Sequence, residues 1–324
     1  MQRLSRFTLV SSLAIAYALF AACGSPAKPE KAVKTVTIIS NTASNFWKVI
    51  QKGAEKADAE LADVNVIFKM TYGATVKEQE RYTNESLVKD DADAIAISPL
   101  DPDGLKDFLD KTARKTTLIT LDSDAPRSAR AVYLGADNRA AGRQAADLLM
   151  KALPKGGKVM VFVGKRLENA QERLAGLREA VSGSKIEILD LMLDDNDISK
   201  ARENATEALN KYPDLAGMVG LWSYNGPAIR QAVENADKLG KVKIVCFDDD
   251  HETLEGIKAG SIFGTVAQQP FEYGYETVKL ASKILKGDKA AIPADKKVLI
   301  PTVVVQRNNV DEYKTKLEHL LGGK

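Results

Sequence analysis

Short runs of β-branched residues alternate with longer amphipathic segments along this chain, and this alternation restricts its fold more than any other feature. The first run, Val36–Ser40, precedes a segment from Asn45 to Leu61 whose apolar residues recur at a helical period. Continuous apolar strands between amphipathic helices are typical of a parallel sheet with both faces covered. The same succession starts again at Lys158. We therefore predict an α/β protein with two doubly wound parallel-sheet lobes, and 324 residues fit two domains of roughly 100–200 residues each.

The first residues have the three-part pattern of a secretory signal. Arg3 and Arg6 provide the positive start, and an apolar run follows that is shorter than a bilayer-spanning helix needs. Because the sequence Leu-Phe-Ala-Ala-Cys at its end resembles a bacterial lipobox, we predict a signal peptide over residues 1–22 and lipidation of Cys23. Residues 23–33 then form a solvated, lipid-anchored linker. The alternative is an ordinary cleaved signal with Cys23 as an incidental thiol.

Charge and the supply of metal-binding side chains exclude several classes of protein. Lys and Arg total 46 against 44 Asp and Glu, so the basic surplus typical of a nucleic-acid binder is missing. The two cysteines, Cys23 and Cys246, cannot build a disulfide framework or a multi-cysteine zinc site. The two histidines, His251 and His319, argue against a histidine-rich metal centre. We predict no metal, no cofactor and no nucleic-acid partner.

Polar and aromatic residues gather directly after the predicted strands. Ligands of doubly wound sheets bind beyond the carboxyl ends of the strands, so these residues are the candidate site. Aromatic residues make up only 6% of the chain, yet five lie at these ends beside carboxylates and amides. They are Phe46, Trp47, Trp222, Tyr224 and Phe247. A sugar requires this mixture, because its CH faces pack on rings while its hydroxyls need acceptors and donors.

Seven short segments, in order from about Lys34 to Lys297, resemble the ribose-type periplasmic sugar-binding proteins of ABC importers, which have the type I two-lobed fold. These segments are Ser44–Trp47, Ile97–Pro99, Ile119–Asp122, Leu134–Asn138 with Gly142, Glu172–Arg173 with Gly176, Val245–Asp248 and Ala267–Pro270. The resemblance implies a multi-strand hinge near Ala136, Gln268 and Ile292. The N-terminal lobe then comprises 34–136 plus 269–292, and the C-terminal lobe 137–268 plus 293–324.

The resemblance also implies roles for individual residues. In that family, aromatic side chains after the first strand stack on the sugar, and Phe46 and Trp47 match them. The acid that ends the fourth strand accepts sugar hydroxyls, a role matched by Asp122. Three further binding positions of the family are matched by Arg173, Asp248 and Gln268.

The chain departs from the family pattern at three places, all of which we keep as candidate ligand contacts. The family's asparagine at one strand end is Ser98 here, a shorter donor. Its Asp-Arg pair is replaced by Asp122-Ser123-Asp124, which adds the carboxylate of Asp124. Another segment is replaced by Trp222, Ser223, Tyr224 and Asn225, so Trp222, Tyr224 and Asn225 become candidates.

Each candidate also has a purely structural interpretation. Phe46 falls on the apolar stripe of its helix and could belong to the core, whereas Trp47 lies one step off that stripe, which favours the cleft. Arg173 could pair with a neighbouring glutamate on the surface. Asp122 and Asn225 could cap helices. For Cys246, inside a predicted strand, we expect a buried core thiol.

Enzymatic functions have little support, so we predict that this protein is not an enzyme. The first strand is not followed by Gly-x-Gly-x-x-Gly, and neither a phosphate loop nor a Gly-x-Ser-x-Gly elbow occurs. Asp122 and Asp248 could be an acid–base pair of a glycosidase, but no feature of the chain fixes their separation. A sugar-sensing repressor would need a DNA-reading motif where the secretion signal lies.

The combined expectation is an extracytoplasmic, membrane-anchored lipoprotein in the periplasm or on the cell surface. It captures a monosaccharide in a cleft between the lobes, closes around it, and delivers it to an ABC-type permease. Two alternatives stay open: the ligand is a nucleoside, or the receptor reports to a chemotaxis or sensor-kinase partner.

Overall fold

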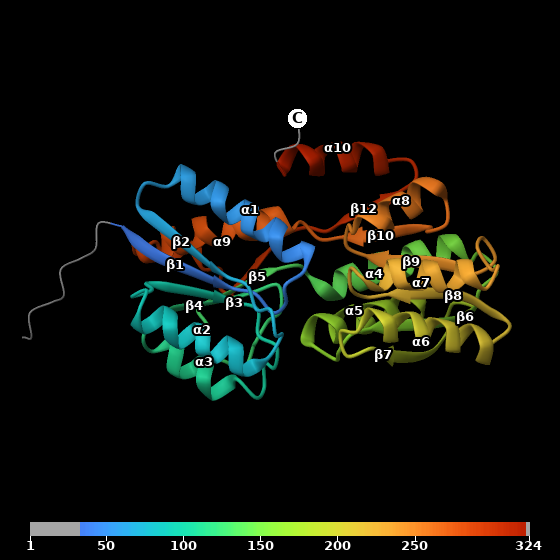
Figure 1. The fold of residues 1–324 in the computed structure, drawn as a ribbon, viewed down its shortest axis with the longest axis horizontal. Helices are drawn as coiled ribbons and strands as arrows, with labels where there is room; N and C mark the ends of the chain where they lie inside the picture. Colours follow the sequence, from blue (N-terminus) through green and yellow to red (C-terminus); the bar gives the residue numbers. More distant parts are fainter. Residues whose placement is uncertain (1–32, 322–324) are drawn as a thin grey trace, which may run out of the picture. The chain divides into compact units, whose positions relative to one another are not determined.

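The computed structural model describes residues 33–321, which contain two six-stranded sheets (Figure 1). The first sheet has the spatial order β2 (Val64–Lys69), β1 (Lys34–Ile39), β3 (Ala94–Ile97), β4 (Thr117–Leu121), β5 (Val132–Gly135) and β11 (Lys297–Leu299). The second has the order β7 (Ile186–Leu193), β6 (Gly157–Val163), β8 (Leu215–Gly220), β9 (Lys243–Phe247), β10 (Gly264–Ala267) and β12 (Val303–Gln306). The predicted α/β class with two doubly wound lobes is confirmed.

The two sheets repeat one topology. In each, the first strand of the lobe lies between the second and the third, and the neighbouring strands run parallel. Only β12 is antiparallel to its neighbour, β10, among the described strands. Successive strands are therefore added on one side of the first strand and then on its other side, so the strand order reverses between β1 and β3 and again between β6 and β8. Ligands of such sheets bind at this reversal, beyond the carboxyl ends of the strands.

Helices cover both faces of the first sheet. We call this sheet and its helices the first lobe. One core lies under α1 (Asn45–Glu60) and α9 (Pro270–Leu285), and the other lies under α2 (Val76–Val88) and α3 (Lys106–Ala113). All four residues of β3 are buried, as expected for a strand covered on both sides. A short 3₁₀ turn, η1 (Lys289–Ala291), follows α9.

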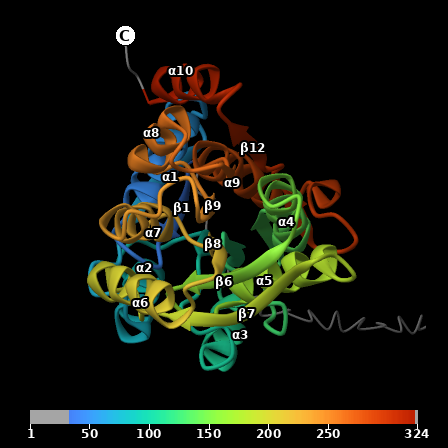
Figure 2. The same cartoon turned by 90° about the vertical axis from the view of Figure 1, so that its right-hand side faces the viewer.

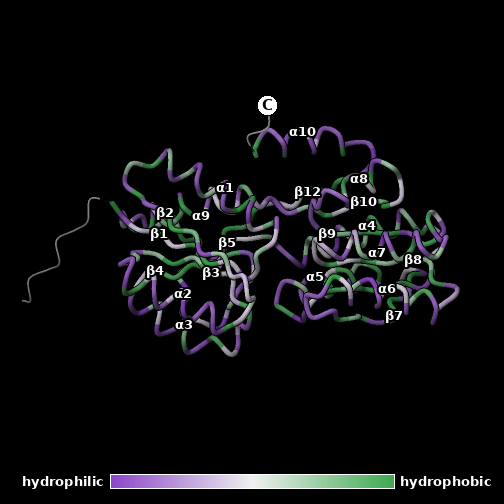
Figure 3. Tube along the Cα trace, viewed as in Figure 1, coloured by the Kyte–Doolittle hydropathy of each residue, from purple (hydrophilic) through white to green (hydrophobic). Residues whose placement is uncertain are grey.

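The second lobe is built in the same way around the second sheet (Figure 2). Helices α4 (Asn138–Ala152) and α5 (Glu168–Val181) cover one face. The other face carries α6 (Ile198–Lys211), α7 (Asn225–Asn235), α8 (His251–Ala259) and α10 (Val310–Leu320). Figure 3 shows apolar residues along the strands and polar residues on the outer helical faces.

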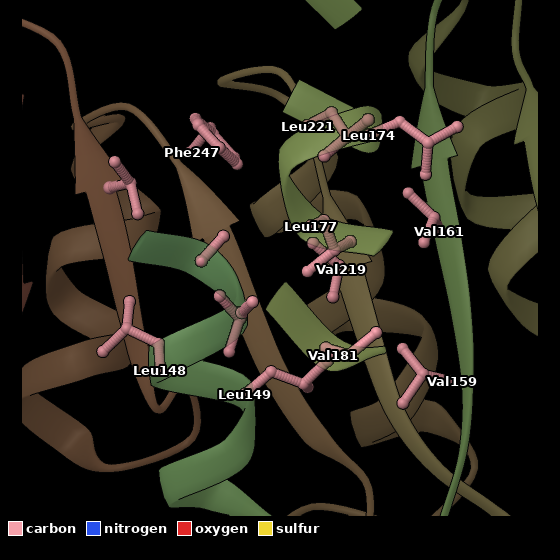
Figure 4. Packing of buried hydrophobic residues seen from close by; sticks show 14 of the residues in the cluster. Leu148, Leu149, Val159, Val161, Leu174, Leu177, Val181, Val219, Leu221 and Phe247 are labelled. Carbon is pink, nitrogen blue, oxygen red and sulfur yellow. The ribbon is translucent and has the colours of Figure 1, made fainter. Parts of the chain in front are cut away.

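Figure 4 shows the core between α4, α5 and the second sheet. Leu149 and Leu177, from the two helices, lie against Val161 and Val219 of the sheet, and each of these side chains is at most 1% exposed. Burying one such side chain contributes roughly 1.5–3 kcal/mol. Cys246 is a fully buried thiol of β9 in the opposite core, as expected.

Glycines allow the helices beside the sheet edge to approach closely. A Cβ atom added at Gly142 of α4 would lie 2.1 Å from the backbone oxygen of Arg173, and one at Gly176 of α5 would lie 2.0 Å from that of Arg139. Two helix backbones can meet this closely only where no side chain intervenes. This contact fixes α5, and with it the position of Arg173.

The chain passes between the two sheets three times. Two passages, after Gly135 and after Ala267, lie next to the predicted positions Ala136 and Gln268. The third lies later than the predicted position near Ile292, because β11 pairs with β5 of the first sheet. The chain leaves that sheet only after Leu299 and then enters β12 of the second sheet.

Among residues 33–321, no helix combines the length and apolar character needed to cross a bilayer.

Candidate ligand-binding site

A cavity of about 930 Å³ lies between the two lobes, at the carboxyl ends of their strands. Its lining includes eight of the candidate residues identified from the sequence. They are Phe46, Trp47, Asp122, Arg173, Trp222, Tyr224, Asp248 and Gln268. The size lies within the range of roughly 300–1,000 Å³ typical of small-molecule sites. The structure thus brings side chains separated by up to about 220 residues to one hollow.

Asp122 presents its carboxylate from the first lobe, at the end of β4. Its φ of 65° and a hydrogen bond from its backbone N–H to the carbonyl of Leu134 (3.0 Å) hold the turn. One carboxylate oxygen accepts from the Ser98 hydroxyl (3.0 Å) and from the Asn41 amide (3.4 Å). Burial raises the pKa of Asp122 to about 6, although Arg173 and the Ser98 hydrogen bond oppose the rise.

Asp248 presents the corresponding carboxylate from the second lobe, at the end of β9. It too has a φ of 65°, and its N–H donates to the carbonyl of Val266 (3.0 Å). The carboxylate accepts a hydrogen bond of 2.7 Å from the side-chain amide of Gln268. Burial raises the pKa of Asp248, and the charge of Arg173 and the bonds from Gln268 partly offset this.

Arg173 is a buried cation between these carboxylates, not a surface ion-pair residue, because its side chain is only 1% exposed. Its Nε donates to the side-chain oxygen of Asn138 (2.9 Å), and Nη1 donates to the carbonyl of Leu221 (2.6 Å). The guanidinium lies 4.5 Å above the ring of Phe247. Within the described chain Nη2 has no hydrogen-bond partner, so a buried donor remains available to a ligand.

The two aromatic residues at the start of α1 have the reverse of their expected burial. Trp47 is 1% exposed, and its Nε1 donates to the Asn41 side chain (2.7 Å). Phe46 is half-buried and meets Trp47 edge-on, with 5.9 Å between ring centroids. The prediction that Phe46 lies on the buried stripe is wrong, because that stripe begins at Trp47 and continues through Ile50 and Ala54. Both rings still border the cavity.

Trp222 and Tyr224 form the aromatic wall of the second lobe. Their rings meet at 67° with centroids 6.4 Å apart. The Tyr224 hydroxyl donates to buried Asp194 (2.5 Å). The indole N–H of Trp222 is buried and, among residues 33–321, finds no acceptor. The wall therefore offers a ligand a flat apolar surface together with an unused donor.

Three candidate residues lie behind the cavity surface instead of on it. Ser98 is fully buried and donates to Asp122. Asp124 accepts two hydrogen bonds from Arg130, of 2.5 and 2.7 Å, so its carboxylate serves an internal ion pair. Asn225 accepts from the backbone N–H of Trp222 (3.0 Å) and donates to Asp194 (3.0 Å), which shapes the aromatic wall. Ser98 and Asn225 therefore hold lining residues in place, whereas Asp124 pairs with Arg130 away from the cavity.

Four lining asparagines were not among the candidates, and Asn41 and Asn169 are two of them. Asn41 joins Trp47, Ser98 and Asp122 in one hydrogen-bonded group on the first-lobe side of the cavity. Asn169, at the start of α5, is 6% exposed, and its side-chain oxygen has no donor in the described part of the chain. Both lie in segments that follow strands, and this position in the sequence indicates a possible ligand contact. An asparagine alone, however, does not distinguish a ligand contact from an ordinary loop residue.

Two other acidic residues at the cavity, Asp249 and Asp250, have structural partners. Asp250 caps α8 by accepting from the N–H of Glu252 (2.9 Å). Asp249 accepts from the hydroxyl of Tyr313 (2.8 Å). No group of three or more His, Cys, Asp or Glu side chains in residues 33–321 could hold a metal ion. Cys23, the predicted lipidation site, lies outside the described residues.

Comparisons with known proteins agree with this arrangement. A model of the periplasmic binding protein domain matches residues 36–289. The ribose import binding protein of Salmonella typhimurium is 26% identical over 298 residues, which cover 90% of this chain and 97% of that protein. The D-allose-binding periplasmic protein of Escherichia coli is 28% identical over 272 residues, 80% of this chain and 86% of that protein.

Solved structures show the same two-lobed fold. An ABC transporter solute-binding protein from Burkholderia graminis, solved in complex with D-arabinose, has a TM-score of 0.82 and 27% identity, covering 88% of this chain and 99% of its own. The chain therefore belongs to the periplasmic binding protein family and has the type I fold of its ribose-type members.

Proposed function

We propose that this protein captures a neutral monosaccharide in the cavity between its lobes and performs no chemistry on it. One observation carries the proposal. Two buried carboxylates, Asp122 and Asp248, face the cavity from opposite lobes beside Arg173, whose Nη2 has no partner among the described residues. Carboxylates accept hydroxyl hydrogen bonds, and the arginine donates to a ring or hydroxyl oxygen.

The aromatic side chains support a sugar rather than a purely polar ligand. Phe46 borders the cavity from the first lobe, and Trp222 borders it from the second. A pyranose or furanose has apolar CH faces that pack against such rings. Two carboxylates against one arginine in the interior disfavour an acidic or phosphorylated sugar, because its charge would be buried beside like charges.

Binding energetics are consistent with such a ligand. A micromolar dissociation constant corresponds to roughly 8 kcal/mol. Six to ten hydroxyl hydrogen bonds at roughly 1 kcal/mol each, together with stacking, reach this value after the cost of closing the lobes. A ligand held by both lobes stabilises the closed form, because only that form makes both sets of contacts.

The names of relatives support the ligand class. They include import proteins for ribose and fructose, and structures solved with D-arabinose and α-D-tagatopyranose. We propose delivery of the captured sugar to an ABC-type permease as the biological role. A sensor-kinase or chemotaxis partner is the alternative, and a permease with an ATPase encoded beside this gene would favour import.

The proposal places the protein outside the cytoplasm, anchored to the membrane by a lipid on Cys23 after removal of residues 1–22. The cysteine follows two small residues at the end of the apolar segment. In cells, Cys23→Ser is expected to move the protein from the detergent-rich phase to the aqueous phase on detergent partitioning. Equal partitioning of the wild type and the variant would contradict the anchor while leaving sugar capture untouched.

A thermal-shift panel tests the ligand class, since binding to the folded form raises the melting temperature. The panel contains pentoses, hexoses, deoxysugars, polyols and nucleosides, followed by calorimetry on each hit. We expect at least one neutral sugar to raise the melting temperature of the wild type. A response to nucleosides alone would replace the monosaccharide by a nucleoside.

A further inference from the structure

Tyr273 lies at the junction of the two lobes without itself lining the cavity. It belongs to the first turn of α9, which packs on the first sheet, and its side chain is fully buried. Its hydroxyl donates to the side-chain oxygen of Gln268 (3.0 Å). Gln268 sits on the passage from β10 to α9, where the chain crosses between the lobes.

The other end of the Gln268 amide reaches the second lobe. Its Nε2 donates to the carboxylate of Asp248 over 2.7 Å. A continuous chain of hydrogen bonds therefore runs from Tyr273 through Gln268 to Asp248, and the three side chains are at most 5% exposed. The ring of Tyr273 also meets Phe46 edge-on at 6.2 Å, so the same residue supports an aromatic side chain on the opposite wall.

We propose that Tyr273 is a positioning residue that acts through Gln268 to hold Asp248 ionised and oriented toward the ligand. The role toward a ligand rests on the proposed function of the cavity. The effect of Tyr273 on the ionisation of Asp248 is expected in the ligand-free protein as well. An amide has one acceptor end and one donor end. Because the Tyr273 hydroxyl satisfies the oxygen, the NH₂ group is free to face the carboxylate.

Removal of the hydroxyl would change this balance. In Tyr273→Phe, the side-chain oxygen of Gln268, a residue only 3% exposed, loses its donor, and an unpaired buried acceptor is unfavourable. The amide then gains by turning its oxygen toward a protonated Asp248, whose O–H can donate to it. The neutral form of Asp248 becomes more favourable, and its pKa rises further above the ordinary value.

The remaining charged and titratable groups around Asp248 stay in place in this variant. They are Arg173 on α5, Asp122 at the end of β4, Asp249 in the same turn, and Tyr313 on α10. Arg173 is the cation among them, and its interactions with Asn138 and Leu221 do not involve Tyr273. A shift in the titration of Asp248 would therefore report on the Gln268 amide.

Titration of Asp248 in the ligand-free protein is the deciding experiment. Aspartate labelled with ¹³C at the side-chain carboxyl is followed by NMR across pH, with Asp248→Asn used to assign the resonance. Tyr273→Phe is expected to raise the midpoint by about one pH unit, the size expected when one hydrogen bond to a charged group is lost. An unchanged midpoint would overturn the proposal.

Tyr133→Phe is the matched control. Tyr133 is also buried beside the cleft, but its hydroxyl donates to the backbone carbonyls of Asp122 and Ala136 (3.0 and 3.2 Å), which do not titrate. We expect the midpoint of Asp248 to stay at the wild-type value in this variant. An equal rise in both variants would point to general loosening of the hinge and contradict a specific role for Tyr273.

A double-mutant cycle tests whether the effect passes through Gln268. In a Gln268→Ala background, Tyr273→Phe should produce no further change in the midpoint. A full additional shift would show that Tyr273 acts on Asp248 by another route. These measurements need no sugar, so failure of the ligand panel and failure of this inference are separate results. With a sugar identified, Tyr273→Phe should also weaken binding about tenfold at pH 7, and equal affinity would count against the proposal.

Discussion

Asp122 and Asp248 occupy equivalent backbone positions in the two lobes. Each directly follows a strand, each has a φ of 65°, and each donates its N–H over 3.0 Å to a carbonyl of the next strand in its sheet. A positive φ is uncommon for residues other than glycine, although aspartate tolerates it better than most. Because the turn recurs in both lobes, it aims one carboxylate at the cavity from each side.

Replacing either carboxylate should therefore weaken ligand binding without unfolding the protein. Asp248→Asn or Asp122→Asn removes an acceptor with a full charge, and a hydrogen bond to such a group contributes about 2 kcal/mol, or roughly thirtyfold in affinity. Calorimetry with the sugar found in the panel gives the affinity, and circular dichroism checks the fold. Asp214→Asn, at a surface ion pair with Lys158, is the control expected to bind normally. Wild-type affinity in both cavity variants would show that the carboxylates do not bind the ligand.

Ligand affinity should also depend on pH because of Asp122. Its pKa is raised to about 6 by burial. The carboxylate is ionised well above pH 6 and about nine-tenths protonated at pH 5, so affinity should fall about tenfold from pH 7 to pH 5. In Asp122→Asn the contribution of Asp122 to this dependence should be missing, which calorimetry at several pH values would reveal as a flatter profile. A flat wild-type profile would contradict an ionised Asp122 as the binding form.

The same group gives the ligand-free protein a dependence of opposite sign. Because the folded pKa lies above the ordinary value of 3.8, the folded state holds its proton more tightly than the unfolded state. The contribution of Asp122 to stability is therefore complete at low pH and is lost as pH rises through about 4 to 6. Urea unfolding of the wild type and Asp122→Asn isolates this contribution as the pH-dependent difference between them.

The fold could be predicted because its signals are local and repeated. Runs such as Val36–Ser40 are continuous and apolar, and the segments between them are amphipathic, which fixes the class and the two blocks. The third crossing could not be placed in the same way. Only the pairing of Lys297–Leu299 with β5 assigns β11 to the first sheet, and edge pairing depends on distant strands.

The site was predicted less completely, and the start of α1 shows why. Stripes beginning at Phe46 and at Trp47 both fit a helical period, since they share Ile50, Ala54 and Ala57. The choice is made by tertiary contacts of Trp47, namely its bond to Asn41 and its packing on Phe68. Periodicity alone contains no information on those partners.

Asp124 does not line the cavity, because its carboxylate is bonded by Arg130, another contact that periodicity does not reveal. This ion pair gives a further prediction. Arg130 is 6% exposed and donates twice to Asp124, so Asp124→Asn would leave a buried guanidinium without its counter-charge. Breaking one side of a buried ion pair costs about 3–5 kcal/mol. We expect that loss in the free energy of unfolding measured with urea, whereas Asp214→Asn at its exposed pair should cost less than about 1 kcal/mol.

Ligand affinity distinguishes this structural role from a binding role. At a temperature where Asp124→Asn is folded, its affinity for the sugar should stay within about threefold of wild type, since the carboxylate does not line the cavity formed by the described residues. A large loss of affinity with unchanged stability would return Asp124 to the binding site.

Replacing Trp222 should have the opposite effect to Asp124→Asn, with weaker ligand binding and unchanged stability. Its indole N–H is buried without an acceptor in residues 33–321, and a buried unpaired donor is unfavourable in the ligand-free protein. A ligand oxygen that accepts from it removes this penalty on binding. Trp222→Phe keeps an aromatic ring but deletes the donor, so we expect about tenfold weaker sugar binding by calorimetry and no decrease in the free energy of unfolding. Tyr224→Phe is the comparison: because its hydroxyl already donates to Asp194, that variant should lose stability, and Trp222→Phe with wild-type affinity would show that the indole N–H does not contact the ligand.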